Sequence, residues 1–282
     1  MSLFQKALSV FSFGSLQIVL GKAISLVNFA ILVRLLTTEE IGIVGLAGGY
    51  IAILSFLLVS PESILIRDFK KISSRINEYI SSYLQFILVR NGILFLIAVP
   101  LAWYISSIQS DSRLSLYFIL LVLATLLNGF TGPFRESFYG LYRQARITFV
   151  DVLMNIALLV SMAALFFSRD VITYGFLQVS IAFISVLWWY WNARKHLHFR
   201  YQPKWNLSLA FQSLKGFGIW NHLSGSVIRL VYQVDIVVLG FFVSLEALGN
   251  YSVALTIANV FFVFPQMVQK ILSLSFSQIE NK

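Results

Sequence analysis

Ionisable and amide side chains occur inside two long apolar segments, where they are unusual enough to indicate a function. Two tracks of polar residues at steps of three are present: Lys22–Ser25–Asn28 and Arg229–Tyr232–Asp235. Residues three apart on a helix are neighbours, so each track slants around one side of its helix. A charge at bilayer depth costs about 3 kcal/mol on insertion scales, so these tracks are expected to face a water-filled cavity or a partner.

Cations outnumber acids among these candidates, which favours an anionic ligand. Arg90, beside Asn91 in a third apolar segment, adds another cation, and Arg34 lies at the far end of the first segment. Arginine can bind a phosphate through two hydrogen bonds, whereas lysine acts as a point charge. We therefore predict six substrate-binding residues around a cavity: Lys22, Arg229, Asp235, Arg90, Asn28 and Arg34. The alternative is that these side chains pair with acids or backbone carbonyls and help to pack the helices, and that Arg34 extends to the membrane interface.

Other chemistries have little support in the sequence. The chain has no cysteine, which excludes disulfides, thiolate catalysis and zinc–thiolate sites. His196 and His198 form a His-x-His pair in a basic connection without a nearby carboxylate, so no metal site is predicted. No nucleophile–base arrangement, phosphate-binding loop or dinucleotide fingerprint is present, so we predict neither an enzyme nor a cofactor.

The segments that carry the polar tracks are membrane spans by composition and length. Of the 282 residues, 58% are hydrophobic and 12% are charged, and the mean hydropathy is +0.81. Lipid cannot satisfy backbone polar groups, and these runs are too long for barrel strands of about 10 residues, so they are expected to be helices. We predict an all-α polytopic membrane protein with about eight transmembrane helices, at residues 13–36, 41–61, 79–103, 114–134, 147–167, 170–191, 217–243 and 248–272.

The connections between the predicted spans alternate in charge. Fifteen of the 21 basic residues fall on one side of the membrane, chiefly in the segments 67–75, 135–146 and 194–215. The opposite connections hold Arg113 and Arg169 together with acidic residues. Because cytoplasmic connections carry the excess of lysine and arginine, we predict that the N terminus and the basic connections are cytoplasmic. The net charge of +9 thus reflects topology, and no nucleic-acid partner is predicted.

An internal repeat relates the two polar tracks. Residues 37–47 align with residues 244–254 at an offset of 207, through a shared Ser/Thr, an acid two residues later and an Ile/Leu-Gly pair. The same offset pairs the two tracks: Lys22 with Arg229 and Asn28 with Asp235. Six spans separate the copies, so both have the same orientation, as in parallel repeats around an axis along the membrane normal.

The repeat also predicts the domain organisation. The longest polar connection follows the sixth span and precedes the second copy. We therefore predict three regions: a six-helix transmembrane bundle at residues 1–191, a basic cytoplasmic linker at 192–215, and the first two helices of a second bundle at 216–282.

Two segments carry a resemblance to a known family. They are LLTTEEIGIVGLA at residues 35–47, after an opening helix, and VDIVVLGFFVSLEALGNYSVALTIANVFFVFPQ at residues 234–266. Their arrangement resembles the polysaccharide transporter family, the flippases of lipid-linked oligosaccharides, in the superfamily that also contains the multidrug and toxin extrusion antiporters. The resemblance implies two six-helix bundles around a central cavity. This chain supplies one bundle and two helices of the next, so we expect a fragment, a truncated gene or two assembling chains.

The resemblance implies a carrier for a polyprenyl-diphosphate-linked oligosaccharide in the bacterial cytoplasmic (inner) membrane. In that role Lys22 and Arg229 hold the diphosphate in the cavity between the bundles, the polyprenyl tail stays in lipid, and one bundle rocks against the other. The implied product is lipopolysaccharide O-antigen, capsule or exopolysaccharide. The implied partners are membrane lipids and polysaccharide polymerase or ligase machinery. An ion gradient or the membrane potential is the expected energy source, since no nucleotide site is recognisable.

The sequence leaves three alternatives open. A multidrug or cation antiporter would need buried carboxylates, of which the deep part of the spans offers chiefly Asp235. A membrane-embedded sugar polymerase or ligase would carry a large polar loop on the outside, where the connections are short. An inactive, truncated remnant of a transporter is the third alternative.

Overall fold

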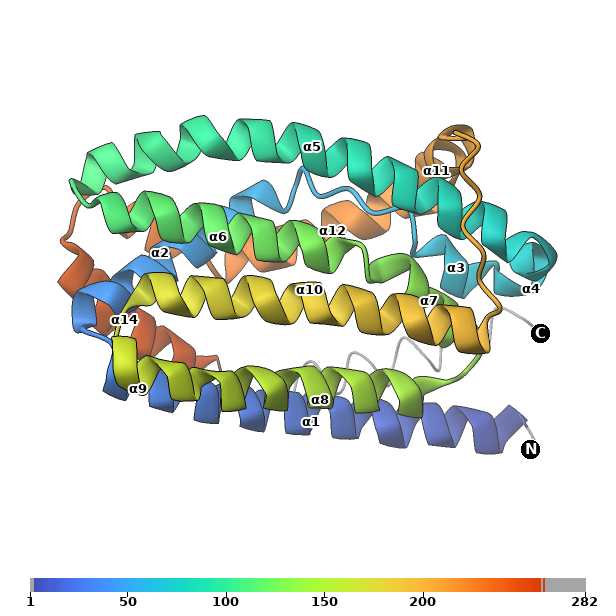
Figure 1. Cartoon of the computed structure of the whole chain (residues 1–282), viewed down its shortest axis with the longest axis horizontal. Coiled ribbons are helices and arrows are strands. Elements are labelled where there is room, and N and C mark those ends of the chain that lie inside the picture. The colour runs from blue at the N-terminus through green and yellow to red at the C-terminus, as the bar shows by residue number, and fades with distance from the viewer. Residues whose placement is uncertain (1–2, 260, 262–282) are drawn as a thin grey trace.

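The structure is a computed structural model that describes residues 3–259 and residue 261. In this part of the chain all regular elements are helices, and the long ones run side by side along one axis (Figure 1). The all-α fold is therefore confirmed. The elements are α1 (Leu3–Leu35), α2 (Thr38–Leu54), α3 (Ile64–Arg67), α4 (Phe69–Ile72), η1 (Ser73–Arg75), α5 (Ile76–Gln109), α6 (Ser112–Gly129), α7 (Gly132–Gly140), α8 (Gln144–Ser161), η2 (Met162–Ala164), α9 (Leu165–Ser168), α10 (Val171–His196), α11 (Ser208–Ser213), η3 (Leu214–Gly218), α12 (Ile219–Val231), α13 (Val234–Leu239) and α14 (Leu245–Ala258).

Five helical segments within the described residues are long and apolar enough to cross a membrane. They coincide with the predicted first, third, fourth, fifth and sixth spans, and they extend over Leu16–Leu35, Ser73–Gln109, Ser112–Gly140, Gln144–Ser168 and Val171–His196. This confirms a polytopic membrane protein. The helices of the other three predicted spans are shorter, and residues 262–272 of the eighth lie outside the described residues.

The second and seventh predicted spans are interrupted helices. α2 ends at Leu54, and residues 55–63 continue as turns and non-helical chain to α3. Pro61 lies in this segment, where it cannot donate a backbone hydrogen bond and disfavours a helical residue before it. In the seventh span, α12 and α13 are separated at residues 232–233. Backbone groups that are freed in this way need partners inside the protein.

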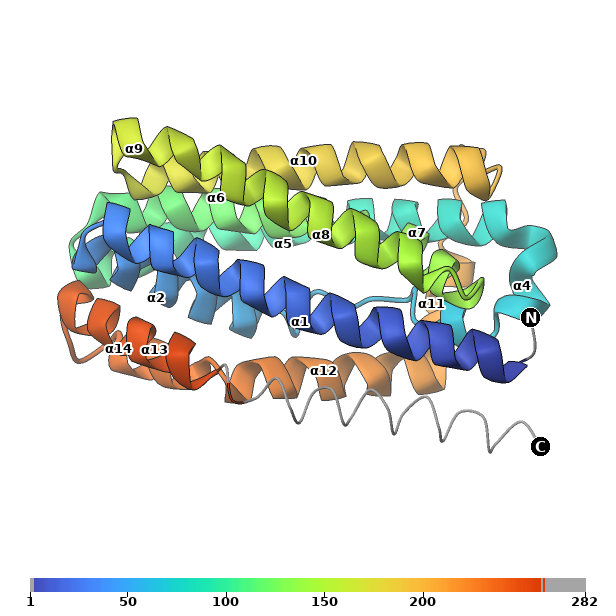
Figure 2. The ribbon, with the colours of Figure 1, turned by 90° about the horizontal axis from the view of Figure 1, so that it is seen from below.

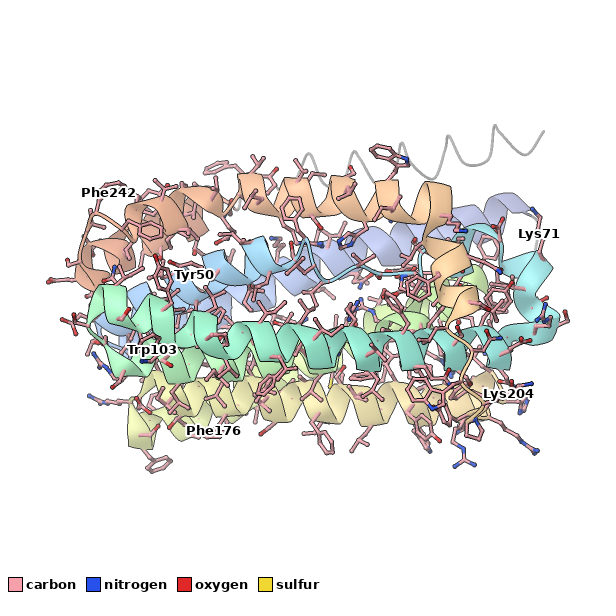
Figure 3. The ribbon with its side chains drawn as sticks, turned by 90° about the horizontal axis from the view of Figure 1, so that it is seen from above. Tyr50, Lys71, Trp103, Phe176, Lys204 and Phe242 are labelled. Atoms are coloured by element: carbon pink, nitrogen blue, oxygen red, sulfur yellow. The ribbon has the colours of Figure 1, made fainter. Side chains whose placement is uncertain are left out.

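The two ends of the molecule differ in charge. The turns that join α1 to α2, α5 to α6, α9 to α10 and α13 to α14 lie at one end, the acidic end (Figure 1). Lys71 and Lys204 lie at the opposite end, the basic end (Figure 3). At the acidic end Arg113 pairs with Asp111 (2.8 Å) and Glu39 (3.4 Å), and this guanidinium lowers the pKa of Asp111. The alternation of the connections is confirmed, whereas the side of the membrane to which each end belongs stays a prediction.

α2 and α14 pack closely through contacts that follow the predicted repeat. A Cβ atom on Gly42 would collide with the carbonyl oxygen of Leu245, and one on Gly249 would collide with that of Thr38. Thr38 and Gly42 are the equivalents of Leu245 and Gly249 at the offset of 207, so the contact is reciprocal, as across a local twofold axis. Small residues allow two membrane helices to approach closely, which explains glycine at both positions.

The remaining helices form a bundle in which α1 packs on α8, and α6 packs between α5 and α10. Figure 2 shows α12, α13 and α14 together along one side of this bundle. One core cluster contains Tyr117 and Phe118 of α6 with Leu46 of α2. A second cluster near the basic end contains Phe138 of α7 and Trp189 of α10. The bundle that surrounds the candidate site is therefore packed at both ends.

The predicted linker is mostly ordered structure on the surface of α5. Its first residues end α10, its later residues form α11, and residues 197–207, called the strap, lie between the two. The strap is hydrogen-bonded to Gln85 of α5, whose Nε2 donates to the carbonyl oxygen of Lys204 (3.1 Å) and whose Oε1 accepts from the backbone N–H of Asn206 (3.0 Å). The connection between the two halves of the chain is thus fastened to the first half.

Candidate functional site

A polar cavity of about 780 Å³ lies inside the first bundle, between α1, α6, α7, α8 and α10. Three charged side chains line it, Lys22, Arg135 and Asp151, together with several amides and hydroxyls such as Asn128 and Gln178. Its volume falls in the range of small-molecule sites, which are concave and carry a few convergent polar groups. This cavity is the candidate functional site.

Helical periodicity brings the polar residues of α1 and α8 to the same cavity. On α1, Gln17, Gly21 and Ser25 recur every four residues, and on α8 Asp151 and Asn155 do the same. Residues four apart lie on one face of a helix, and these two faces meet because α1 and α8 pack side by side. No atom outside the helix comes within 4 Å of a Cβ built on Gly21, which leaves room at this position.

A hydrogen-bonded cluster of four side chains lies along the part of the cavity nearer the basic end. Arg135 Nη2 and Asp151 Oδ2 are 2.6 Å apart, and the amide of Gln17 donates to the same carboxylate oxygen. Gln144 Nε2 donates to Gln17 Oε1 at 2.7 Å. The cluster therefore joins α1, α7 and α8, and it pairs the one acid of the cavity with one of its two cations.

Lys22 is the second cation of the cavity. Its side chain is partly buried, and no hydrogen bond or ion pair joins it to another side chain within the described part of the chain. The cavity thus keeps one positive charge after Arg135 and Asp151 have paired. An unneutralised ammonium group inside a membrane bundle is costly, and an anionic ligand would offset that cost.

Arg90 lies outside the cavity lining, at the interrupted second span. Its Nη1 donates to the carbonyl oxygens of Val59 (2.7 Å) and Leu58 (3.4 Å), and its Nε and Nη2 donate to Asn91 Oδ1 (3.1 and 2.9 Å). These carbonyls belong to the non-helical segment after α2 and have lost their helical partners. Arg90 therefore makes the contacts that the packing alternative predicts, and substrate binding by Arg90 stays a prediction.

Arg229 belongs to a separate polar cluster where α12 meets the end of α2. Its Nη2 donates to Ser226 Oγ (3.1 Å), and Ser226 Oγ in turn donates to the carbonyl oxygen of Ser55 (3.2 Å). His222 Nε2 lies 3.1 Å from the carbonyl oxygen of Phe56. This cluster satisfies freed carbonyls of the second span, and Arg229 is an exposed residue.

The other three predicted residues occupy different environments. Asp235 accepts hydrogen bonds from the backbone N–H of Ile236 (2.9 Å) and from the hydroxyl of Tyr251, so it joins α13 to α14. Asn28 is buried, and its Oδ1 has no hydrogen-bond partner. Arg34 is exposed in the last turn of α1, near the acidic end.

The six predicted residues are therefore distributed over several places. Lys22 lines the cavity, and among the described side chains none of the six is hydrogen-bonded to another of the six. The repeat partners Lys22 and Arg229 lie in different clusters. Whether any of the six binds substrate stays a prediction.

Three residues of the cavity cluster were not among those predicted from the sequence: Arg135, Asp151 and Gln17. Arg135 counts among the basic residues of a connection, but α7 continues the fourth span and carries it to the cavity. Asp151 lies near the start of its predicted span. The signal that could have found it is the spacing of Asp151 and Asn155, which gives α8 a polar track like that of α1.

Comparison with known proteins gives one match. A family model described as polysaccharide biosynthesis protein matches residues 31–282. This range includes Arg135 and Asp151 and begins after Lys22. No curated protein and no solved structure matches the chain.

Proposed function

The chain belongs to the family of polysaccharide biosynthesis proteins, and from this premise we propose that it is a flippase for a polyprenyl-diphosphate-linked oligosaccharide. The family and the five apolar helices together support a polysaccharide-related role in membrane transport. The proposed location is the bacterial cytoplasmic membrane, with the basic end in the cytoplasm. The proposed product is a surface polysaccharide such as O-antigen, with a polymerase or ligase as the next partner.

The observation that carries the proposal is the unneutralised Lys22 in the cavity. Lys22 lines a cavity formed by residues of five helices, and the cavity acid is already paired with Arg135. A diphosphate or an acidic sugar supplies the missing negative charge, and the surrounding amides and hydroxyls suit sugar hydroxyl groups. In the proposed cycle Lys22 holds the anionic group while alternating access exposes the cavity first to one end and then to the other.

A multidrug or cation antiporter is the competing function, and the interactions of Asp151 and Asp235 disfavour it. Asp151 pairs with Arg135, and Asp235 accepts hydrogen bonds from Ile236 and Tyr251. A cationic substrate would therefore meet an excess of positive charge in the cavity. We further propose that the chain is a carrier rather than an enzyme.

The proposal predicts a specific loss when Lys22 is neutralised. Lys22→Ala is expected to lower surface polysaccharide about 10- to 100-fold, because a hydrogen bond to a charged group contributes about 1.5–3 kcal/mol. Lys22→Arg keeps the charge and should retain most of the export. The measurement is surface polysaccharide and inner-leaflet lipid-linked oligosaccharide in cells whose sole copy of the gene carries each variant.

Lys71→Ala is the matched control, because Lys71 is a lysine with an 83% exposed side chain at the basic end. It should leave export unchanged at equal protein abundance in the membrane. Normal export by Lys22→Ala at equal abundance would exclude Lys22 as the anion-binding residue.

A further inference from the structure

One face of α7 packs against the segment that leads from the second span into α3 and α4. A Cβ atom on Gly132 would collide with Glu62 Oε1, and one on Gly140 would collide with the ring of Phe69. Glu136 lies four residues from each glycine, so it is on the same face of α7. Glu62 and Glu136 therefore lie on opposite sides of the same interface, and they interact electrostatically.

Three oxygen atoms in this interface are buried without a hydrogen-bond partner: Glu62 Oε2, Ser63 Oγ and Glu136 Oε2. The side chain of Glu62 is 9% exposed, so it is inside the protein. An ionised carboxylate can only accept hydrogen bonds, whereas a protonated carboxyl group also donates one. Two buried carboxylates close together disfavour double ionisation, because like charges repel and burial penalises each charge.

The charged and titratable side chains near this pair have their hydrogen bonds and ion pairs with other groups. Among the described side chains, the charged and titratable groups that act on the pair are Arg90 and Tyr83 from α5 and Arg135 and Tyr139 from α7. Arg90 donates to backbone carbonyls and Asn91, Arg135 pairs with Asp151, and Tyr83 is hydrogen-bonded to Ser213 (2.7 Å). Within the described side chains neither Glu62 nor Glu136 has an ion pair; Ser60 is hydrogen-bonded to Glu62, and Arg90 and Arg135 act on the pair only from a distance.

We propose that Glu62 and Glu136 form a proton-binding pair that shares one proton, taken from solvent at the basic end. The proton supplies the donor that the buried oxygens lack, and it leaves a single negative charge between the two carboxyl groups. A metal ion fits less well, because no cluster of three or more His, Cys, Asp or Glu side chains occurs among the described residues.

The pair is placed to act on the cavity through α7. Glu136 directly follows Arg135, whose guanidinium pairs with Asp151 in the cavity wall. Loss of the shared proton adds a negative charge on one face of α7, and the repulsion between Glu62 and Glu136 would shift this short helix and the Arg135–Asp151 pair with it. This second step rests on the proposed transport function and makes the proton the coupling ion.

Infrared difference spectroscopy of the purified full chain tests the pair without requiring transport. The C=O stretching band of a protonated carboxyl group should be present at neutral pH and should disappear when the pH is raised. Glu62→Gln and Glu136→Gln should each remove or shift this band, since the amide has the shape of the protonated acid. Glu78→Gln is the control, because Glu78 pairs with Arg75 (2.8 Å) near the surface and should leave the band unchanged.

Two outcomes would overturn the proposal. One is the lack of a protonated carboxyl band at neutral pH in the unmodified chain, a result that does not depend on how well a variant folds. The other is a sodium-dependent rise in thermal stability that Glu62→Gln abolishes, which would assign the pair to a metal ion. A band that behaves as expected while Lys22→Ala exports normally would leave the proton pair standing and exclude Lys22 as the anion-binding residue.

Discussion

At the scale of single residues, the three charged side chains of the cavity differ in whether they have a partner of opposite charge. Arg135 and Asp151 neutralise each other at 2.6 Å and also fix three helices relative to one another through Gln17. Lys22 has no such partner among the described side chains. A paired charge contributes to the folded structure, and an unpaired one is available for a ligand, so different substitutions in the same cavity should affect different properties.

The ion pair predicts a loss of stability. Arg135→Ala is expected to lower the free energy of unfolding by about 1–3 kcal/mol, because Asp151 then stays partly buried without the guanidinium. The double variant with Asp151→Ala should lose less than the sum of the two single variants, by about 0.5–3 kcal/mol. Thermal unfolding of both single variants and the double variant in detergent measures this coupling.

Arg75→Ala provides the comparison, because its ion pair with Glu78 is largely exposed and should contribute little to the stability. Strictly additive losses for Arg135 and Asp151 would show that the two side chains do not stabilise each other.

At the scale of elements, the close approach of α2 and α14 explains why the repeat was visible in the sequence. The reciprocal collisions of Gly42 and Gly249 with opposite carbonyls require glycine at both positions. Gly45 and Ser252, which the repeat also makes equivalent, lie directly opposite each other, since a Cβ on Gly45 would collide with Ser252 Oγ. Few residues are identical between the copies, but those at the helix contact are restricted by space.

This contact predicts opposite effects for two glycines of one helix. Gly42→Ala should lower the free energy of unfolding by about 1–3 kcal/mol, because the added methyl group meets backbone that cannot move aside. Gly48→Ala should be neutral or stabilising by up to about 1 kcal/mol, since no atom outside the helix lies within 4 Å of its Cβ position. Thermal unfolding of both variants measures the two changes in stability. Equal changes for Gly42→Ala and Gly48→Ala would refute the close contact between α2 and α14.

Other features of the elements could not be predicted from hydrophobicity. An apolar run does not show whether its helix is continuous, so the interruption at residues 55–63 was missed, although Pro61 was visible. Nor does a span show how its helix is rotated. The sequence identified Lys22 as a lysine in a span, but its neighbours Arg135 and Asp151 become visible only when α1, α7 and α8 are packed. The expected cavity between two bundles stays a prediction.

At the scale of the whole molecule, charge is segregated along the long axis. Lys71 and Lys204 lie at one end, and the turns that carry Glu39, Asp111 and Glu246 lie at the other (Figures 1 and 3). This separation is the basis for placing the basic end in the cytoplasm.

Labelling of single cysteines tests this orientation, since the natural chain has none. Lys71→Cys and Glu246→Cys both replace exposed residues, at the basic and the acidic end. A membrane-impermeant thiol reagent applied to spheroplasts should label the Glu246→Cys protein and leave the Lys71→Cys protein unlabelled until the membrane is opened. The reverse pattern would invert the proposed orientation.

The strap has a consequence for the order in which the chain acquires its structure during synthesis. The partners of Gln202 and Asn206 on α5 precede them by 121 residues, so the ribosome has released those partners before the strap emerges. Domains commonly form in the order of their synthesis. The first six predicted spans can therefore be complete, with the strap hydrogen-bonded to them, before α12 emerges from the ribosome. The second half of the chain then begins to fold from a position that is already fixed on α5, and not from the end of a flexible linker.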